Sequence, residues 1–183
     1  RLFTGSVALD LLRDASTNVL VVPGARAVAV AQLPPVLRRI LVATDLSPIG
    51  NRAVAYALAV APHDGEVIVV HVVSPNLVRD GQHGRPSHPS FTAAHREVLE
   101  QRRAALSALV PQDCGARTVR IEIVEHDRVG RAIIEAIERE APDLVCVGTL
   151  GRTGASAALF GSTAQTLVRG CHRPLLLVQQ HDR

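Results

Sequence analysis

Glycines and one hydroxyl residue recur near the end of the chain at a spacing that could bind phosphate. Gly148 and Gly151 lie three residues apart, and Gly161-Ser162 follows at the predicted start of a helix. A glycine lacks Cβ, so its backbone can approach a ligand closely or adopt a positive φ. A helix N-terminus offers N–H groups without intrahelical partners, and these bind phosphate oxygens. The pattern predicts an anion site; the alternative is that the glycines shape a turn and Ser162 is a helix cap.

Alternating strands and helices must position these residues. From Arg39 onward, short apolar strands alternate with helical patterns, and the predicted elements are Arg39–Thr44, Pro48–Ala61 with Ser47 as its cap, Glu66–Val73, Thr92–Leu109, Thr118–Val124, a helix capped by Asp127 and ending near Glu140, Asp143–Val147, Ser162–Gly170 and Pro174–Val178. Strands that are apolar on both faces and joined by helices form a parallel, doubly wound sheet. Ligands of such sheets bind at the carboxyl ends of the strands, which here carry Ala43-Thr44-Asp45 and Gly148-Thr149-Leu150-Gly151. Residues 74–90 read as a long loop.

A helix–strand pattern occurs twice, 156 residues apart. Residues 5–22 and 161–178 align without a gap and share seven identical positions. A repeat over so long a distance indicates tandem domains. We therefore expect residues 1–23 to be the C-terminal helix and strand of a preceding domain, residues 24–37 to be a linker, and residues 38–183 to be a complete domain. The alternative is a chance similarity between two helix–strand pairs of an α/β protein.

Composition narrows the classes of function. Aromatic residues make up 2% of the chain, too few for the stacking surfaces that single-stranded nucleic acids require. All twenty basic residues are arginines and they are scattered, which excludes a P-loop lysine and argues against a nucleic-acid partner. The three cysteines lack metal-ligand spacing, and no apolar run has the length of a membrane span. These features predict a cytoplasmic protein without a membrane partner.

In these motifs and their spacing, the chain resembles the universal stress protein family. The family's nucleotide signature, G-x2-G-x9-G-[ST], is complete here in Gly148, Gly151, Gly161 and Ser162. The first strand with its aspartate (ILVATDLSP), the second strand (VIVVHVV) and the closing strand (PLLLV) are also similar. The resemblance implies a three-layer, flavodoxin-like fold with a five-stranded parallel sheet in the order 3-2-1-4-5. It also implies ATP as the ligand, since members with this signature bind it.

The resemblance places a set of residues around the nucleotide. Those expected to bind it are Ala43, Thr44, Asp45, Val72, Gly148, Gly151, Arg152, Gly161, Ser162 and Thr163. The first three would border the adenosine, Val72 would face the adenine with its backbone, and the glycines and Ser162 would hold ribose and phosphates. The alternative role of Asp45 is to cap the next helix, and Arg152 could instead lie in water.

The sequence indicates no catalytic group beside this site. The sequence shows no nucleophile–base pair, no carboxylate pair and no metal cluster. His71, inside an apolar strand, is read as structural, and His126 stands where the family often has glycine. We expect a regulatory or sensing role with ATP. The alternatives are a slow Mg²⁺-assisted ATPase, autophosphorylation at Ser162 or Thr163, and a dimerisation domain that keeps the motif unused.

The last strand, Pro174–Val178, is expected at an edge of the sheet, where an apolar strand invites pairing. In the family, two domains pair across this strand. The leading fragment carries its own copy, Asn18–Val22. We expect the two strands to pair antiparallel, within one chain or between two chains.

Overall fold

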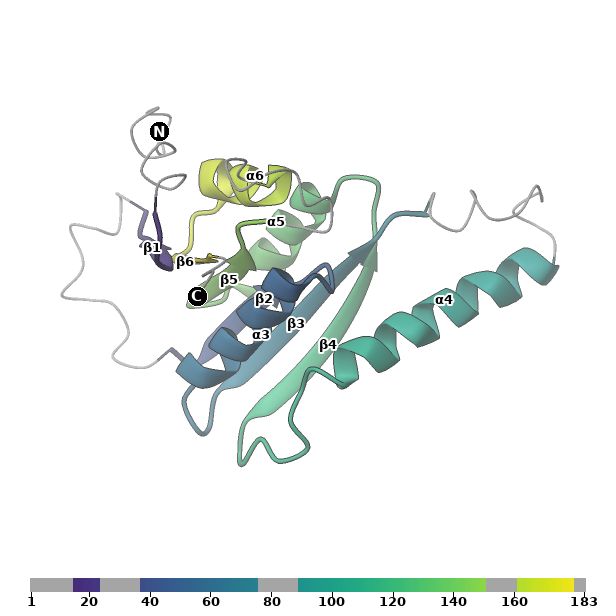
Figure 1. The fold of residues 1–183 in the computed structure, drawn as a ribbon, viewed down its shortest axis with the longest axis horizontal. Helices are drawn as coiled ribbons and strands as arrows, with labels where there is room; N and C mark the ends of the chain where they lie inside the picture. The colour runs from purple at the N-terminus through teal and green to yellow at the C-terminus, as the bar shows by residue number, and fades with distance from the viewer. Residues whose placement is uncertain (1–14, 24–36, 76–88, 151–160, 180–183) are drawn as a thin grey trace.

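Strands and helices alternate along the part of the chain that the computed structural model describes, residues 15–23, 37–75, 89–150 and 161–179 (Figure 1). In chain order they are β1 (Val19–Val21), β2 (Arg39–Ala43), α3 (Pro48–Val60), β3 (Glu66–Val73), α4 (Pro89–Ser107), β4 (Thr118–Glu125), α5 (Val129–Glu140), β5 (Leu144–Gly148), α6 (Ser162–Gly170) and β6 (Leu175–Val178). The bounds agree with the predicted ones to within two residues, except that α4 begins three residues earlier, at Pro89. The predicted preceding helix, most of the predicted linker and residues 76–88 of the predicted loop lie outside the described residues.

The described strands form one sheet in the order β1-β6-β5-β2-β3-β4. The central strand β2 pairs in parallel with β3 and β5, and β4 and β6 continue the parallel pairing outward. At the far edge β1 pairs antiparallel with β6, with Leu20 opposite Leu176. Strands β2 to β6 follow the predicted parallel order 3-2-1-4-5, but the predicted five-stranded, all-parallel sheet is corrected to a six-stranded, mixed sheet. The difference arises because β1 occupies the edge that β6 would otherwise leave open.

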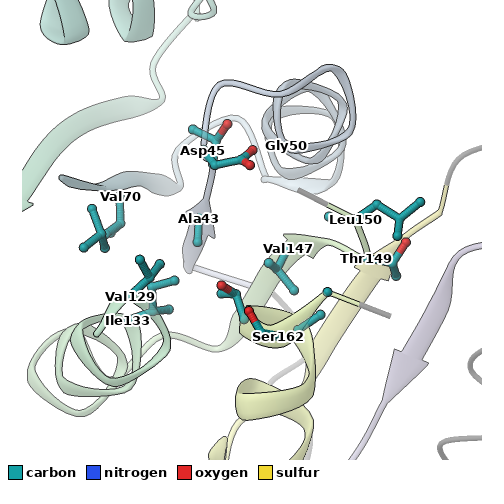
Figure 2. A pocket seen from close by; sticks show the side chains of 16 residues that line it. Ala43, Asp45, Gly50, Val70, Val129, Ile133, Val147, Thr149, Leu150 and Ser162 are labelled. Carbon is teal, nitrogen blue, oxygen red and sulfur yellow. The ribbon is translucent and has the colours of Figure 1, made fainter. Parts of the chain in front are cut away.

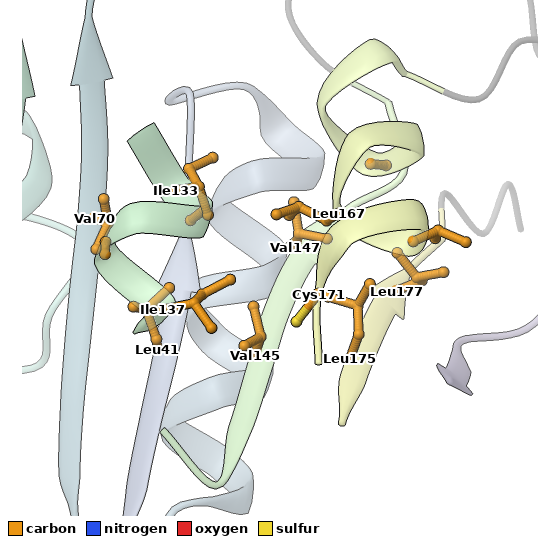
Figure 3. Close-up of a cluster of buried hydrophobic side chains, with 14 of the residues drawn as sticks. Leu41, Val70, Ile133, Ile137, Val145, Val147, Leu167, Cys171, Leu175 and Leu177 are labelled. Carbon is orange, nitrogen blue, oxygen red and sulfur yellow. The ribbon is translucent and has the colours of Figure 1, made fainter. Parts of the chain in front are cut away.

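Two apolar layers separate the sheet from its helices, because successive side chains of a strand point to opposite faces. On one face Ile40 packs with Val54 in the layer under α3 and α4. On the other face Leu41 packs with Ile133 of α5 and Leu167 of α6 (Figure 3). The three-layer arrangement with helices on both faces agrees with the sequence prediction. Among the described helices, none combines the length and the apolar character needed to cross a bilayer.

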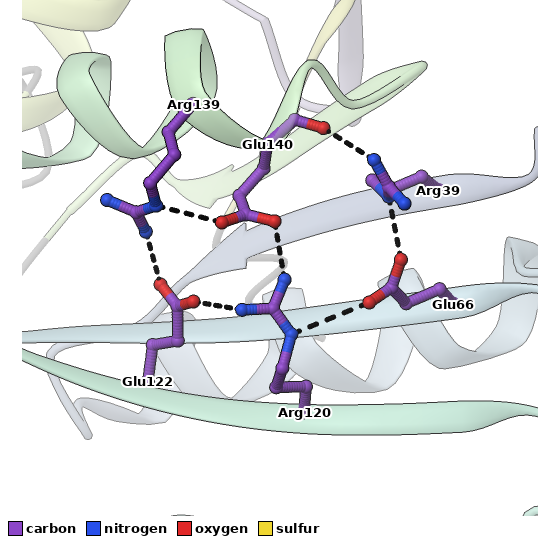
Figure 4. A network of polar contacts seen from close by, with 6 residues as sticks. All are labelled: Arg39, Glu66, Arg120, Glu122, Arg139 and Glu140. Atoms are coloured by element: carbon purple, nitrogen blue, oxygen red, sulfur yellow. Dashed lines mark hydrogen bonds and ion pairs between the residues drawn. The ribbon is translucent and has the colours of Figure 1, made fainter.

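A network of three arginines and three glutamates ties α5 to the strands near the amino ends of β2 and β3; its members are Arg39, Glu66, Arg120, Glu122, Arg139 and Glu140 (Figure 4). Arg120 on β4 contacts Glu66, Glu122 and Glu140. Hydrogen bonds from Arg139 and then Arg120 hold the pKa of Glu140 below its usual range. The network fixes the end of α5 and leaves the opposite end of the sheet, at the carboxyl ends of the strands, for the site described next.

Candidate functional site

A cavity of about 250 Å³ opens at the carboxyl ends of β2 and β5 (Figure 2). The ends of these strands, the neighbouring part of β3, and the first turns of α5 and α6 contribute its lining. This is the place where a doubly wound sheet reverses its strand order, since chain connections run from β2 to β3 on one side and from β5 to β6 on the other. The topology therefore puts the predicted crevice and the observed cavity in the same position.

The cavity brings together most of the residues expected around a nucleotide. Those that line it are Ala43, Thr44, Asp45, Val72, Gly148, Gly161, Ser162 and Thr163. The other two, Gly151 and Arg152, lie outside the described residues. Segments far apart in the sequence thus meet at one cavity, while contact between these residues and a ligand remains a prediction.

Side-chain hydrogen bonds shape the turn between β2 and α3. Thr44 Oγ1 accepts from Leu46 N at 3.0 Å, and Asp45 Oδ1 accepts from Ser47 N at 3.0 Å. Ser47 Oγ accepts from Gly50 N at 3.1 Å, which confirms Ser47 as the helix cap. Asp45 therefore supports the turn and is not the cap. Leu46 has a φ of 66°, a conformation that costs about 1–3 kcal/mol and persists here because these bonds offset the cost.

His71 braces this turn from inside the protein. Its side chain is buried, and Nδ1 lies 2.8 Å from the carbonyl oxygen of Thr44. Because a carbonyl oxygen only accepts, Nδ1 carries the hydrogen and donates it. The backbone of Thr44 also donates to the carbonyl oxygen of Val70 at 3.0 Å. The prediction that His71 is structural is confirmed, since it fixes the floor of the turn that carries Asp45.

Gly148 is required by packing of the protein against itself. A Cβ at this position would lie 2.8 Å from Cγ2 of Ile49 and 3.1 Å from its carbonyl carbon. A Cβ at Gly50 would likewise lie 2.7 Å from Asp45 Oδ1. Among the described glycines, a positive φ occurs at Gly115 alone. The expected reason for Gly148, a positive φ or ligand approach, therefore has a competing structural cause: the first turn of α3 sits directly against the end of β5.

Two helix N-termini meet the cavity without a side-chain cap. Gly161 is the N-cap of α6, and Ser162 is the first helical residue rather than the cap. The N-cap of α5 is Arg128, so the predicted cap Asp127 is wrong. The helix starts one residue later because the ring of His126 accepts from Arg128 N at 2.8 Å through Nδ1 and takes over the turn. The first N–H groups of both helices lack carbonyl partners within the helix, and both N-termini carry partial positive charge.

Apolar side chains form the other wall of the cavity, and the sequence analysis missed most of them. Val70 and Val72 come from β3, and Val129 and Ile133 come from α5. Val129 is a large apolar residue at the first position of helix α5, and its side chain is 38% exposed. That placement is the signal that could have found it. Thr149 and Leu150 line the cavity, as expected for the end of β5, and the lining residues not anticipated are Gly50, Val147 and Ala164.

The described lining of the cavity carries few ionisable side chains. Asp45 is the one ionisable side chain among its described lining residues. No group of three or more potential metal-ligating side chains occurs in the described part of the chain. An apolar wall from β3 and α5 at one side and the N-terminus of α6 at the other match a ligand with a flat, weakly polar part and an anionic part.

Comparison with protein families gives a match over most of the chain. The model described as "Universal stress protein family" matches residues 37–179. A universal stress protein of Thermus aquaticus is 32% identical over 145 residues, which cover 78% of this chain and 98% of that protein. Universal stress protein MJ0531 of Methanocaldococcus jannaschii is 28% identical over 148 residues, covering 78% of this chain and 82% of that protein.

Solved structures share the fold at lower identity. Protein MJ0577 superposes with a TM-score of 0.67 at 21% identity, over 80% of this chain and 99% of that chain. A universal stress protein in complex with cAMP superposes with a TM-score of 0.50 at 23% identity, over 79% and 98% of the two chains. A universal stress protein from Archaeoglobus fulgidus gives 0.60 at 23% identity, over 98% of this chain but 55% of that chain.

Proposed function

The chain belongs to the universal stress protein family, and we propose that it binds ATP in the cavity at the ends of β2 and β5. Family membership supports a role in the response to stress. The proposed role of the nucleotide is regulatory: its presence changes the shape or the partners of a cytoplasmic protein. The cavity offers binding groups, and no nucleophile–base pair lies among its described lining residues.

One observation carries the proposal: the N-terminus of α6 and an apolar wall line the same cavity. Phosphates bind at a helix N-terminus because the N–H groups and the helix dipole both favour negative charge. The first turn of α6 lines the cavity with Ser162 and Thr163. The adenine is proposed to lie against Val72 and Val129 at the other wall, where a planar ring replaces water on apolar surface.

Asp45 is proposed to contact the nucleotide in one of two ways, by binding a ribose hydroxyl or by binding a Mg²⁺ ion. One of its oxygens already accepts a hydrogen bond from Ser47 N, which orients the carboxylate at the cavity wall. A carboxylate beside a triphosphate would repel it unless it binds a ribose hydroxyl or shares a Mg²⁺ ion. Gly151 and Arg152 complete the proposed set, on the strength of the sequence motif alone.

Two solved relatives support the proposal in different ways. The structure in complex with cAMP shows that a protein of this fold can hold an adenine nucleotide. This chain spans about half of the Archaeoglobus fulgidus protein, which suits the proposed tandem arrangement with residues 1–23 as the end of a preceding domain. In that arrangement β6 would receive a strand of the neighbouring domain, and β1 occupies that place in this chain.

The direct test is a calorimetric titration of the full chain with ATP and Mg²⁺. We expect micromolar binding, which corresponds to about −8 kcal/mol. Replacing Ser162 by Asp should weaken binding about tenfold or more, because the new carboxylate stands where the phosphates would bind. The same change should raise stability by about 0.3–1 kcal/mol through the helix dipole. Ser162→Asn is the uncharged control of nearly equal shape.

The outcomes separate the proposal from its competitors. Weaker binding in Ser162→Asp together with unchanged or higher stability supports phosphates at α6. Equal ATP affinity in the two variants would place the nucleotide elsewhere. An absence of ATP binding in the unaltered chain would favour a dimerisation domain that keeps the motif unused. Phosphate release within minutes of mixing would favour the ATPase.

A further inference from the structure

Thr149 connects the cavity to two other elements. It is buried and lines the cavity directly after β5. Its carbonyl oxygen accepts from Gly161 N, the cap of α6, at 2.7 Å. Its backbone N donates to the carbonyl oxygen of Val178 at 2.9 Å. A displacement of the α6 N-terminus therefore acts on Thr149, and through Thr149 on the end of β6.

Gln179 continues this connection to the edge strand. Its side-chain Oε1 accepts from the hydroxyl of Thr149 at 2.8 Å. Its backbone N donates to Oδ1 of Asn18, the residue before β1, at 3.0 Å. Its carbonyl oxygen accepts from the guanidinium of Arg52 on α3 at 3.3 Å. One residue thus holds the cavity, α3 and the start of β1 together.

Strand β1 is a short strand at the edge of the sheet. It has three residues and pairs with β6 through a single ladder. Its central side chain, Leu20, is 54% exposed, and only the partly buried Val19 and Val21 pack the strand against the core. Short edge strands with few buried contacts open locally at low free-energy cost. The bond from Gln179 to Asn18 lies at the end of this ladder that is nearer the cavity.

We propose that filling the cavity tightens the pairing of β1 with β6, with Thr149 and Gln179 as the positioning residues that connect the two events. A phosphate group bound at the α6 N-terminus would fix Gly161, and Gly161 in turn fixes Thr149 and the Gln179 side chain. The inference rests on the proposed binding of ATP. The coupling is reciprocal by thermodynamic necessity: a docked β1 strengthens nucleotide binding by the same factor.

Hydrogen exchange followed by mass spectrometry tests the proposal on the full chain. Saturating ATP should slow the exchange of the β1 backbone amides by about fivefold or more. Gln179→Ala removes the link to Thr149 but keeps the backbone bond to Asn18. In this variant ATP should still bind, and its effect on β1 exchange should fall below about twofold, a loss of coupling. Gln101→Ala, an exposed position on α4, is the matched control and should keep the full effect.

A second variant keeps the test decisive if Gln179→Ala does not fold. Thr149→Val removes the donated hydrogen and keeps both backbone bonds of residue 149. Conversely, Asn18→Ala should weaken ATP binding by the factor measured for β1 protection. The proposal is overturned if ATP binds the unaltered chain and leaves β1 exchange unchanged, or if the Gln179 variant retains the full effect. Failure of ATP to bind at all would instead overturn the proposed function, together with this inference.

Discussion

The backbone of Gly148 lies against Ile49 so closely that a Cβ on the glycine would stand 2.8 Å from Cγ2 of the isoleucine. The contact joins the end of β5 to the first turn of α3 and forms one side of the cavity. A glycine of a nucleotide signature is therefore also a packing residue. Loss of binding in a Gly148 variant would not by itself show contact with a nucleotide.

Gly148→Ala should destabilise the fold. The new methyl group overpacks against Ile49 and against the backbone of Gly50, whose N would lie 3.2 Å away, at a cost of about 1–3 kcal/mol. Urea unfolding followed by circular dichroism measures the difference. In an Ile49→Ala background the same change should cost less, because the nearest atom has been removed. Equal cost in both backgrounds would mean that the side chain of Ile49 is not the obstacle.

Val129→Ala should weaken ATP binding and leave stability almost unchanged. Val129 is 38% exposed at the cavity wall, so its methyl groups gain burial mainly from a ligand. Each methylene equivalent buried by adenine contributes about 0.8 kcal/mol, or roughly a fourfold change in affinity. Val60→Ala is the control, since Val60 is 41% exposed on α3 and does not line the cavity. Calorimetry should show weaker ATP binding in Val129→Ala than in Val60→Ala. Equal ATP affinities of the two variants would mean that the adenine does not lie against this wall.

Sequence patterns were sufficient to predict the helices and strands and the place of the cavity. The elements follow from the local periodicity of apolar residues, and the place of the cavity follows from the way the strands are connected. The wall made by Val129 and Ile133 was not predicted as part of the site. A helical pattern shows that these residues share a face, but whether that face meets the sheet or a cavity depends on how far α5 extends past the strands. The cap of α5 was placed wrongly for a related reason: His126 competes with Asp127 for the turn through a ring nitrogen.

Glu140→Gln should flatten the acid limb of the stability curve. The hydrogen bonds from Arg139 and Arg120 lower the pKa of Glu140 in the folded state, so its contribution to stability is present above the unfolded pKa of about 4.3. That contribution is lost as the pH falls below this value toward the lower pKa of the folded state. Unfolding midpoints in urea, recorded from about pH 7 down to about pH 3 across the range in which glutamates titrate, measure this contribution. The exposed Glu138→Gln on the same helix is the control and should leave the curve unchanged.

The three thiols should differ sharply in reactivity. Burial raises the pKa of Cys146 to about 12 and also raises that of Cys171. The thiolate is the reactive form, so neither should react in the folded protein near pH 8. Cys114 is partly exposed and should react. Titration with Ellman's reagent should count one fast thiol in the native protein and all three in denaturant; rapid labelling of Cys146 would contradict its place in the core.

Pairing of β1 with β6 within one chain also sets a competition between copies. The strand that fills the edge of the sheet is tethered to it through residues 22–38, and a tether of short length holds its end at an effective concentration on the order of millimolar. The same strand of another molecule makes identical hydrogen bonds but is present only at its bulk concentration. Exchange of β1 between molecules is therefore suppressed in dilute solution. A high protein concentration restores it, and so does a shortened tether that no longer lets β1 reach β6 of its own chain.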